Sequence, residues 1–220
     1  HHPDKNIVFV ENPIYDHTNN IYSLWLARDL MAQDDTLLLE SDLIFEDAVL
    51  DAALHSECRN VALVANYDTW MDGTMVKIDD DNNIVNFIPK KAFNYDDTDS
   101  YYKTVNIYKF TREFITDRYL PFLEAYIKVL GENEYYEQVL RVITLIDSCD
   151  LKALPVTGMH WYEIDDVQDL RIAETIFAPP ALRLEKMQKS FGGYWRYSGV
   201  LDFCYLVNPY FPRRRMVEEM

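Results

Sequence analysis

Apolar runs and helical apolar spacings alternate along the first third of the chain. Short β-branched or leucine-rich runs predict buried strands, and apolar residues that repeat with the helical period predict helices between them. The predicted strands cover 6–10, 36–40 and 61–65, and the predicted helices cover 21–32 and 46–54. This β-α-β-α-β order predicts a parallel sheet covered by helices.

The middle of the chain has a different pattern. Two apolar stretches flank the polar run 79–83, which predicts a hairpin with its turn in that run. The remaining predicted strands cover 103–109, 151–156 and 160–164, and the remaining predicted helices cover 119–130, 135–146 and 167–177. Ala178 and the two prolines after it mark a boundary. We therefore expect an α/β domain over 1–178 and a separate segment over 179–220.

Charge and cysteine content narrow the class of protein. The 220 residues include 21 basic and 37 acidic side chains, a formal net charge of −16. This charge argues against a protein that binds nucleic acid through Lys and Arg, but it is compatible with a mononucleotide held through Mg²⁺. No apolar run approaches the ~20 residues that span a bilayer. The spacing of Cys58, Cys149 and Cys204 supports neither a disulfide framework nor a metal motif, which favours a reducing cytoplasm.

Glycine is scarce in this chain. It has 6 glycines, and none of them forms the spacing of a dinucleotide-binding or Walker A loop. Nucleotide chemistry here must therefore use other residues, or must have lost its glycine loop.

Asp42 is the first candidate site residue. It follows the predicted buried strand 36–40, at the edge where open α/β sheets bind ligands. A carboxylate at such an edge suits Mg²⁺ bound to nucleotide phosphates. The alternative is that Asp42 caps a short turn before Ile44.

Asp165 and Asp166 form a second acidic pair, between a predicted strand and a predicted helix. Asp165 and Gln168 have the spacing of a capping box, so a helix cap is one interpretation. Two adjacent carboxylates exceed what capping needs, and a bound metal would offset their mutual repulsion. Both interpretations remain open from the sequence.

Two other charged runs are candidates for binding ions or phosphate. The run Asp79–Asp81 begins like a calcium-binding loop, but the required glycine and closing glutamate are absent, so a solvated turn is favoured. Lys90 and Lys91, with Lys103 further along, either hold a phosphate or phosphonate or form a solvated edge.

Four segments carry a resemblance to a known family. They are 18–24 (TNNIYSL), 38–42 (LLESD), 103–106 (KTVN) and 162–169 (YEIDDVQD). In order and spacing they resemble the sugar-phosphate nucleotidyltransferase superfamily, in its CTP:phosphocholine and phosphonate cytidylyltransferase branch. The resemblance covers about residues 6–178, and the last segment is its most specific part.

The resemblance implies a Rossmann-like nucleotidyltransferase fold and a Mg²⁺ ion held by Asp42 and Asp165. It implies that the phosphate or phosphonate oxygen of a small substrate attacks the α-phosphorus of CTP, and that pyrophosphate leaves. Site residues follow from the same resemblance. The nucleotide base would lie near Asn20 and Ser23, and the acceptor substrate would lie toward Lys103, Asn106, Glu134 and Trp161.

The chain departs from this family at its start. The family opens with a strand, a glycine-rich loop containing Arg, and a catalytic Lys, and nothing in this chain matches them. We therefore expect the first βαβ portion of the fold to precede His1, and no catalytic residue is assigned within this chain.

A second resemblance lies beyond the prolines. Residues 191–197 and 201–212 resemble the opening of a class I/II aminotransferase domain that uses pyridoxal phosphate (PLP). The segment with the Schiff-base lysine is absent, so PLP would bind only to a part outside this chain. The resemblance implies a bifunctional cytidylyltransferase–aminotransferase acting on an aminophosphonate such as 2-aminoethylphosphonate.

Two rival functions remain open. A GT-A glycosyltransferase also binds a nucleotide and a metal through acids at a strand end, and Glu40-Ser-Asp42 is an imperfect version of its DxD motif. A binding module that kept the fold without the catalytic loop is the non-enzymatic rival. The expected partners are CTP, a small phosphate or phosphonate and, in a homodimer, a second copy of the chain.

Overall fold

A computed structural model describes residues 4–146, 150–189, 196–197, 200–201 and 214–219. They separate into two compact units, His1–Asp165 and Asp166–Met220, and each unit is described by itself. The expected division into a nucleotidyltransferase domain to residue 178 and an aminotransferase segment after it stays a prediction.

The first unit contains five α-helices and eight strands among its described residues. The helices are α1 (Asn20–Met31), α2 (Asp47–His55), α3 (Arg112–Phe114), α4 (Leu120–Leu130) and α5 (Glu137–Ile146). The strands are β1 (Thr36–Leu39), β2 (Leu43–Phe45), β3 (Val61–Asn66), β4 (Met75–Ile78), β5 (Ile84–Ile88), β6 (Tyr102–Phe110), β7 (Lys152–Pro155) and β8 (Trp161–Glu163). Short 3₁₀ turns cover Lys90–Ala92 and Tyr95–Ser100, and a π-helical turn covers Ile115–Tyr119.

The sequence pattern predicted a parallel sheet, and this prediction is wrong about which strands are neighbours and about their directions. The large sheet has the order β5-β4-β6-β3-β7, with β1 also paired to β6, and β2 and β8 form a separate two-stranded sheet. Among the strands of the described residues, β3 and β7 are the one parallel pair, and β6 lies antiparallel to β1, β3 and β4. The long strand β6, late in the sequence, lies between β1 and β3, which the local pattern treated as neighbours.

The strand expected at 6–10 is also absent from the structure. Phe9 is 87% exposed, and the flanking Ile7, Val8 and Val10 are exposed too. An apolar run forms a strand only where another strand pairs with it, and none of the described strands pairs with this one. The hairpin at 75–88 and the other predicted elements are confirmed with small shifts of their ends.

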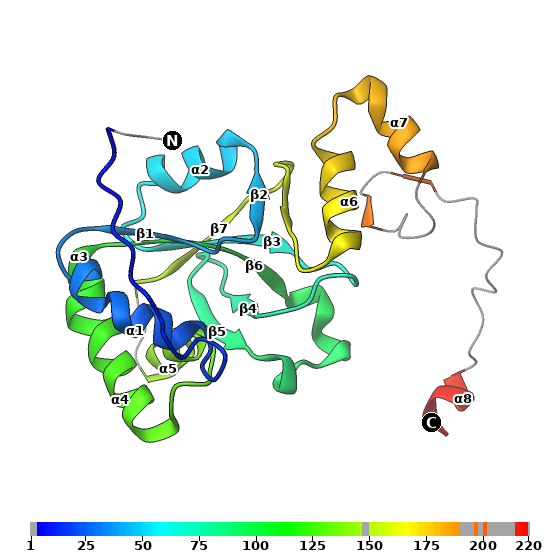
Figure 1. The fold of residues 1–220 in the computed structure, drawn as a ribbon. Helices are drawn as coiled ribbons and strands as arrows, with labels where there is room; N and C mark the ends of the chain where they lie inside the picture. The colour runs from blue at the N-terminus through cyan, green and yellow to red at the C-terminus, as the bar shows by residue number, and fades with distance from the viewer. Residues whose placement is uncertain (1–3, 147–149, 190–195, 198–199, 202–213, 220) are drawn as a thin grey trace. The chain divides into compact units, whose positions relative to one another are not determined.

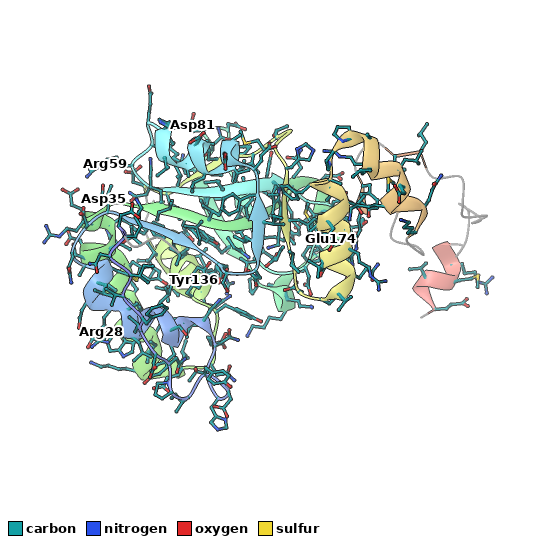
Figure 2. The ribbon with its side chains drawn as sticks, turned by 45° about the horizontal axis from the view of Figure 1, so that its top comes forward. Arg28, Asp35, Arg59, Asp81, Tyr136 and Glu174 are labelled. Carbon is teal, nitrogen blue, oxygen red and sulfur yellow. The ribbon has the colours of Figure 1, made fainter. Side chains whose placement is uncertain are left out.

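Helices cover both faces of the large sheet (Figure 1). On one face, residues of α1, α4 and α5 pack with alternate residues of β3, including Ala62 and Val64. On the other face, Val49 and Ala53 of α2 pack against Val61 and Leu63. Successive side chains of a strand point to opposite faces of the sheet. Because helices cover both faces, β3 is buried on both sides. Figure 2 shows side chains filling these layers, with Tyr136 in the interior.

One edge of strand β6 pairs with two different strands, one toward each of its ends. It pairs with β1 through Ile107–Phe110 and with β4 through Tyr102 and Lys103. Between these two pairings β1 has ended and β4 has not begun, so residues 104–106 of β6 face a gap between the two strands. Opposite this point the register of β3 against β6 shifts between Ala62 and Val64, which marks a bulge in β6.

The second unit contains α6 (Val167–Ile176), α7 (Pro180–Gln188) and α8 (Arg214–Glu218). Asp166 caps α6, and its side chain forms a capping box with Asp169. Asp169 also pairs with Arg196. Most of the segments 191–197 and 201–212, which carry the aminotransferase resemblance, lie outside the described residues. None of the described helices is long and apolar enough to span a bilayer.

Candidate active site

A cavity of about 930 Å³ lies beside β6, between the end of β1 and the start of β4. Its walls come from the end of β1, the loop before β4, β6, the start of α5 and the end of β8. Among the residues predicted for the site, the cavity is lined by Asn20, Ser23, Asp42, Lys103, Asn106, Glu134 and Asp165. Trp161 is not among the lining residues, because it packs into the core beneath α2. Lys90 and Lys91 also line this cavity.

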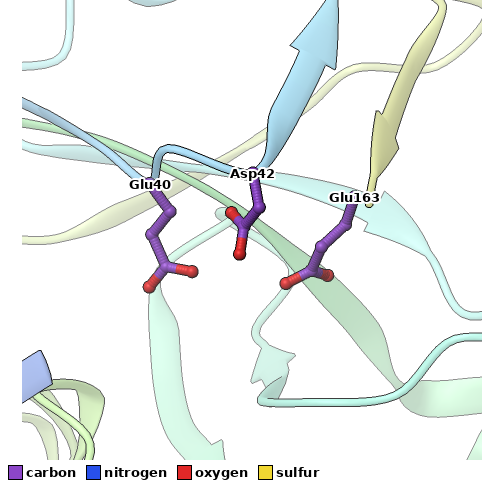
Figure 3. A group of neighbouring side chains, drawn as sticks. All are labelled: Glu40, Asp42 and Glu163. Carbon is purple, nitrogen blue, oxygen red and sulfur yellow. The ribbon is translucent and has the colours of Figure 1, made fainter. Parts of the chain in front are cut away.

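Three carboxylates that line this cavity lie close together. Glu40, Asp42 and Glu163 have carboxylate oxygens within 4.8 Å of one another, and Figure 3 shows the three side chains pointing into one space. The antiparallel register of β2 and β8 pairs Leu43 with Glu163, and the Ile164 amide donates to the Asp42 carbonyl at 2.9 Å. This pairing brings two acidic motifs, far apart in the sequence, side by side.

Asn106 holds two of these carboxylates in place. Its Nδ2 donates to Glu40 Oε2 at 3.0 Å and to Glu163 Oε1 at 2.9 Å. Its own Oδ1 accepts a 2.8 Å hydrogen bond from the Thr104 hydroxyl, which fixes the orientation of the amide. Asn20 Nδ2 also donates to Glu40, at 3.4 Å. Asn20 and Asn106, which the sequence predicted as ligand contacts, therefore orient carboxylates of the site.

The backbone conformation at position 106 favours an asparagine there. Its φ is 59°, in the left-handed region, and it lies within the bulge of β6. Asn and Asp tolerate this region better than other residues with a side chain. Strained backbone within a strand is characteristic of functional sites, and here it aims an amide at two carboxylates.

Lys103 is the cation of the buried part of the site. It is 2% exposed, and its Nζ pairs with Glu163 Oε2 at 3.1 Å and donates to the Thr104 carbonyl at 2.9 Å. Gly73 lies against it with φ +94°, and a Cβ at Gly73 would lie 3.2 Å from Nζ. The backbone conformation at 73 therefore favours glycine, and a side chain there would press against the lysine.

The acidic group is electrostatically unfavourable without a ligand. Burial raises the pKa of Glu40, and the charges of Asp42 and Glu163 raise it further. Burial likewise raises the pKa of Glu163, with added repulsion from Asp165 and Asp42, while Lys103 acts in the opposite direction. A bound cation would offset this repulsion.

The residues present fit a hard divalent cation. Asp42 Oδ1 is buried and has no hydrogen-bond partner among the described residues, whereas Glu40 and Glu163 already accept hydrogen bonds from Asn106. Carboxylate oxygens are the ligands that Mg²⁺ prefers. Asp166, not Asp165, caps α6, so the capping interpretation of Asp165 and Gln168 is wrong. Asp165 lines the cavity.

Several acidic residues that line the cavity were not predicted as site residues, among them Glu163 and Glu137. Glu163 lies inside the motif that drew attention to Asp165, two residues before it, and the period of a strand would have placed both on one face. Glu137, which also lines the cavity, is a buried acid at the start of a helix, where acids are common. Only its burial identifies it.

Asn106→Asp is expected to destabilise the protein by about 3 kcal/mol, because each hydrogen bond to a charged group contributes about 1.5–3 kcal/mol and a third carboxylate replaces the donor. Urea denaturation measures the loss. Asn82→Asp is the matched control, since Asn82 has φ 60° in an exposed turn. Equal losses in both variants would show that the backbone, not the amide, accounts for the effect.

Solved structures identify the class of the fold. The chain superposes on the CTP:phosphocholine cytidylyltransferase of Streptococcus pneumoniae with a TM-score of 0.60 and 20% identity, over 76% of this chain and 67% of that one. The inositol-1-phosphate CTP transferase of T. maritima gives 0.53 and 18%, over 80% and 64%. The chain thus has the Rossmann-like nucleotidyltransferase fold that the sequence motifs implied.

Curated proteins add a relative of the same class. The chain is 32% identical over 214 residues to CMP-5'-(3-aminopropyl)phosphonate synthase of Streptomyces rubellomurinus. The alignment covers 96% of this chain and 34% of that protein, so the chain spans about a third of its length. No family model matches the chain. The solved structures show the nucleotidyltransferase fold, and the activity of this chain and its aminotransferase resemblance are left as predictions.

Proposed function

We propose that this chain is the nucleotidyltransferase part of an enzyme that transfers CMP from CTP to a small phosphonate or phosphate, with release of pyrophosphate. The observation that carries the proposal is the cavity, which collects carboxylates and lysines from distant segments within a nucleotidyltransferase fold. The name of the Streptomyces relative, a CMP-aminopropylphosphonate synthase, supports a phosphonate as the acceptor.

The proposed reaction joins two anions, so positioning and charge neutralisation are the main tasks of the protein. An oxygen of the acceptor forms a bond to the α-phosphorus of CTP, and the bond from that phosphorus to the bridging oxygen breaks, releasing pyrophosphate. Lys90, Lys91 and Lys103 line the cavity and would attract the anionic groups. Asn20 and Ser23, at the start of α1, are proposed to lie near the nucleotide base.

Mg²⁺ is proposed as the cofactor. Asp42 and Asp165 would hold it, with Glu40 and Glu163 adding negative charge around it. When bound, the ion would neutralise phosphate charge on the nucleotide. Asn106 would keep the neighbouring carboxylates oriented through its two hydrogen bonds. Glu134 is kept as a residue near the acceptor, and Trp161 would act only through packing.

Pyrophosphate release tests the proposal. The natural full-length protein that contains these residues is expected to release pyrophosphate from CTP when 2-aminoethylphosphonate or phosphocholine is added with Mg²⁺. The signal should require both CTP and an acceptor. Absence of release with every acceptor tried would contradict the proposed function.

The rival functions predict different products. A GT-A glycosyltransferase would transfer sugar from a nucleotide-sugar without releasing pyrophosphate, and a binding module would bind CTP without turnover. An attached PLP-dependent domain, a homodimer and a cytoplasmic location remain predictions. Mass determination of the purified natural protein, together with the absorbance of bound PLP, tests the first two.

A further inference from the structure

A buried carboxylate oxygen in the cavity lacks a hydrogen-bond partner. Glu137, the first residue of α5, lines the cavity and is 4% exposed. Its Oε2 is buried and has no partner among the described residues. The hydroxyl of the adjacent Tyr136 lies against the Glu40 carboxylate. Buried polar atoms are rarely left unpaired, so Glu137 Oε2 indicates a missing donor.

The charges around Glu137 indicate that the donor is a cation. Glu40 and Glu163 face it with like charge, and Lys103 is the opposite charge that acts on it. Lys103 is already committed to Glu163 and to the Thr104 carbonyl. Burial and the charge of Glu40 raise the pKa of Glu137 to about 8, so an arriving cation would favour its ionised form.

We propose that Glu137 binds the primary ammonium group of the acceptor. This inference rests on the proposed function. A primary ammonium carries three N–H donors, one of which suits the Glu137 oxygen that lacks a partner. A quaternary ammonium has no N–H donor and would leave this oxygen unpaired.

The surroundings favour an ammonium over a second metal ion. A divalent cation needs about six oxygen ligands, and the carboxylates that act on Glu137, Glu40 and Glu163, already accept hydrogen bonds from Asn106. The same cavity carries Lys90 and Lys91, which suit the anionic end of a zwitterion. The acceptor class is therefore a short phosphonate or phosphate that ends in a primary amine.

Calorimetric titration of the full chain with matched probes tests the inference. The probes are 2-aminoethylphosphonate, propylphosphonate, which replaces the ammonium with a methyl group, and phosphocholine, which carries a quaternary ammonium. The unaltered protein is expected to bind 2-aminoethylphosphonate at least about tenfold more tightly than the other two, as a hydrogen bond to a charged group predicts. Glu137→Gln should weaken 2-aminoethylphosphonate about tenfold or more and change propylphosphonate less than about twofold.

Glu124→Gln is the matched control, because Glu124 is exposed on α4 and pairs with Lys128 away from the cavity. Its affinities should equal those of the unaltered protein. The comparison of probes on the unaltered protein also decides the matter if Glu137→Gln fails to fold. Equal affinity for the three probes, or no binding of 2-aminoethylphosphonate, would overturn the inference.

Two further outcomes separate this inference from the proposed function. If probe discrimination holds but no pyrophosphate is released from CTP with any acceptor, the ammonium site stands and the proposed function fails. If Glu137→Gln weakens Mg²⁺ alone as much as it weakens 2-aminoethylphosphonate, Glu137 belongs to the metal site and the inference is wrong.

Discussion

Asp42→Asn is expected to slow pyrophosphate release from CTP by about three orders of magnitude, because loss of metal charge stabilisation amounts to several kcal/mol and each 1.36 kcal/mol is a factor of ten. The substitution keeps the shape of the side chain and removes its charge. Asp42 Oδ1 is the buried carboxylate oxygen of the acidic group that has no hydrogen-bond partner among the described residues. No internal hydrogen bond of that atom is lost, so the fold should be retained.

The measurements for Asp42→Asn are steady-state pyrophosphate release and binding of Mn²⁺ as a spectroscopic substitute for Mg²⁺. Asp80→Asn is the matched control, because Asp80 is exposed in the hairpin turn between β4 and β5. It should leave both measurements unchanged. A rate for Asp42→Asn within about threefold of the unaltered protein would remove Asp42 from the metal site, since a charged ligand contributes far more than that.

Elements with strong local patterns were predictable from the sequence. The helix at 137–146 and the hairpin at 75–88 have clear apolar periods, and both appear close to their expected positions. The neighbours of each strand were not predictable, because strand pairing depends on residues far apart in the chain. β6 lies between β1 and β3 although both precede it in the sequence.

The residues of the candidate site were likewise only partly predictable from the sequence. Strand-end position singled out Asp42, and the cavity contains it. The motif around Asp165 contained Glu163 as well, but only the register between β2 and β8 shows that Glu163 lies beside Asp42. Trp161 belongs to the same motif and packs into the core instead. A motif identifies a segment, and the pairing of the strands decides which of its side chains meet.

The role of Asn106 also depends on features that the sequence does not display. The sequence of the segment Lys103–Asn106 does not predict a bulge or a residue with a left-handed backbone conformation. The sequence indicated Asn106 as a contact to the acceptor, whereas the structure has its amide bound to two carboxylates. Hydrogen bonds between residues 66 and 57 positions apart cannot be read from local spacing.

Glu137→Gln is expected to stabilise the protein at pH 8 and to leave its stability nearly unchanged at pH 5. The folded state holds the pKa of Glu137 at about 8, against an ordinary value of 4.5. Between these two values the unfolded chain loses the proton while the folded protein keeps it, so the stability of the unaltered protein falls as pH rises from about 4.5 to about 8. Glutamine, neutral at every pH, removes that dependence.

Urea denaturation followed by tryptophan fluorescence at pH 5, 6.5 and 8 measures the difference in unfolding free energy between the two proteins. The difference should grow with pH to the order of 4–5 kcal/mol at pH 8, since each unit of pKa shift corresponds to about 1.4 kcal/mol. Glu124→Gln should show no such growth, because Lys128 lowers the pKa of exposed Glu124. Parallel stability curves for Glu137→Gln and the unaltered protein would show that burial does not hold Glu137 neutral. Saturating 2-aminoethylphosphonate should reduce the difference at pH 8, because a bound ammonium favours the ionised carboxylate.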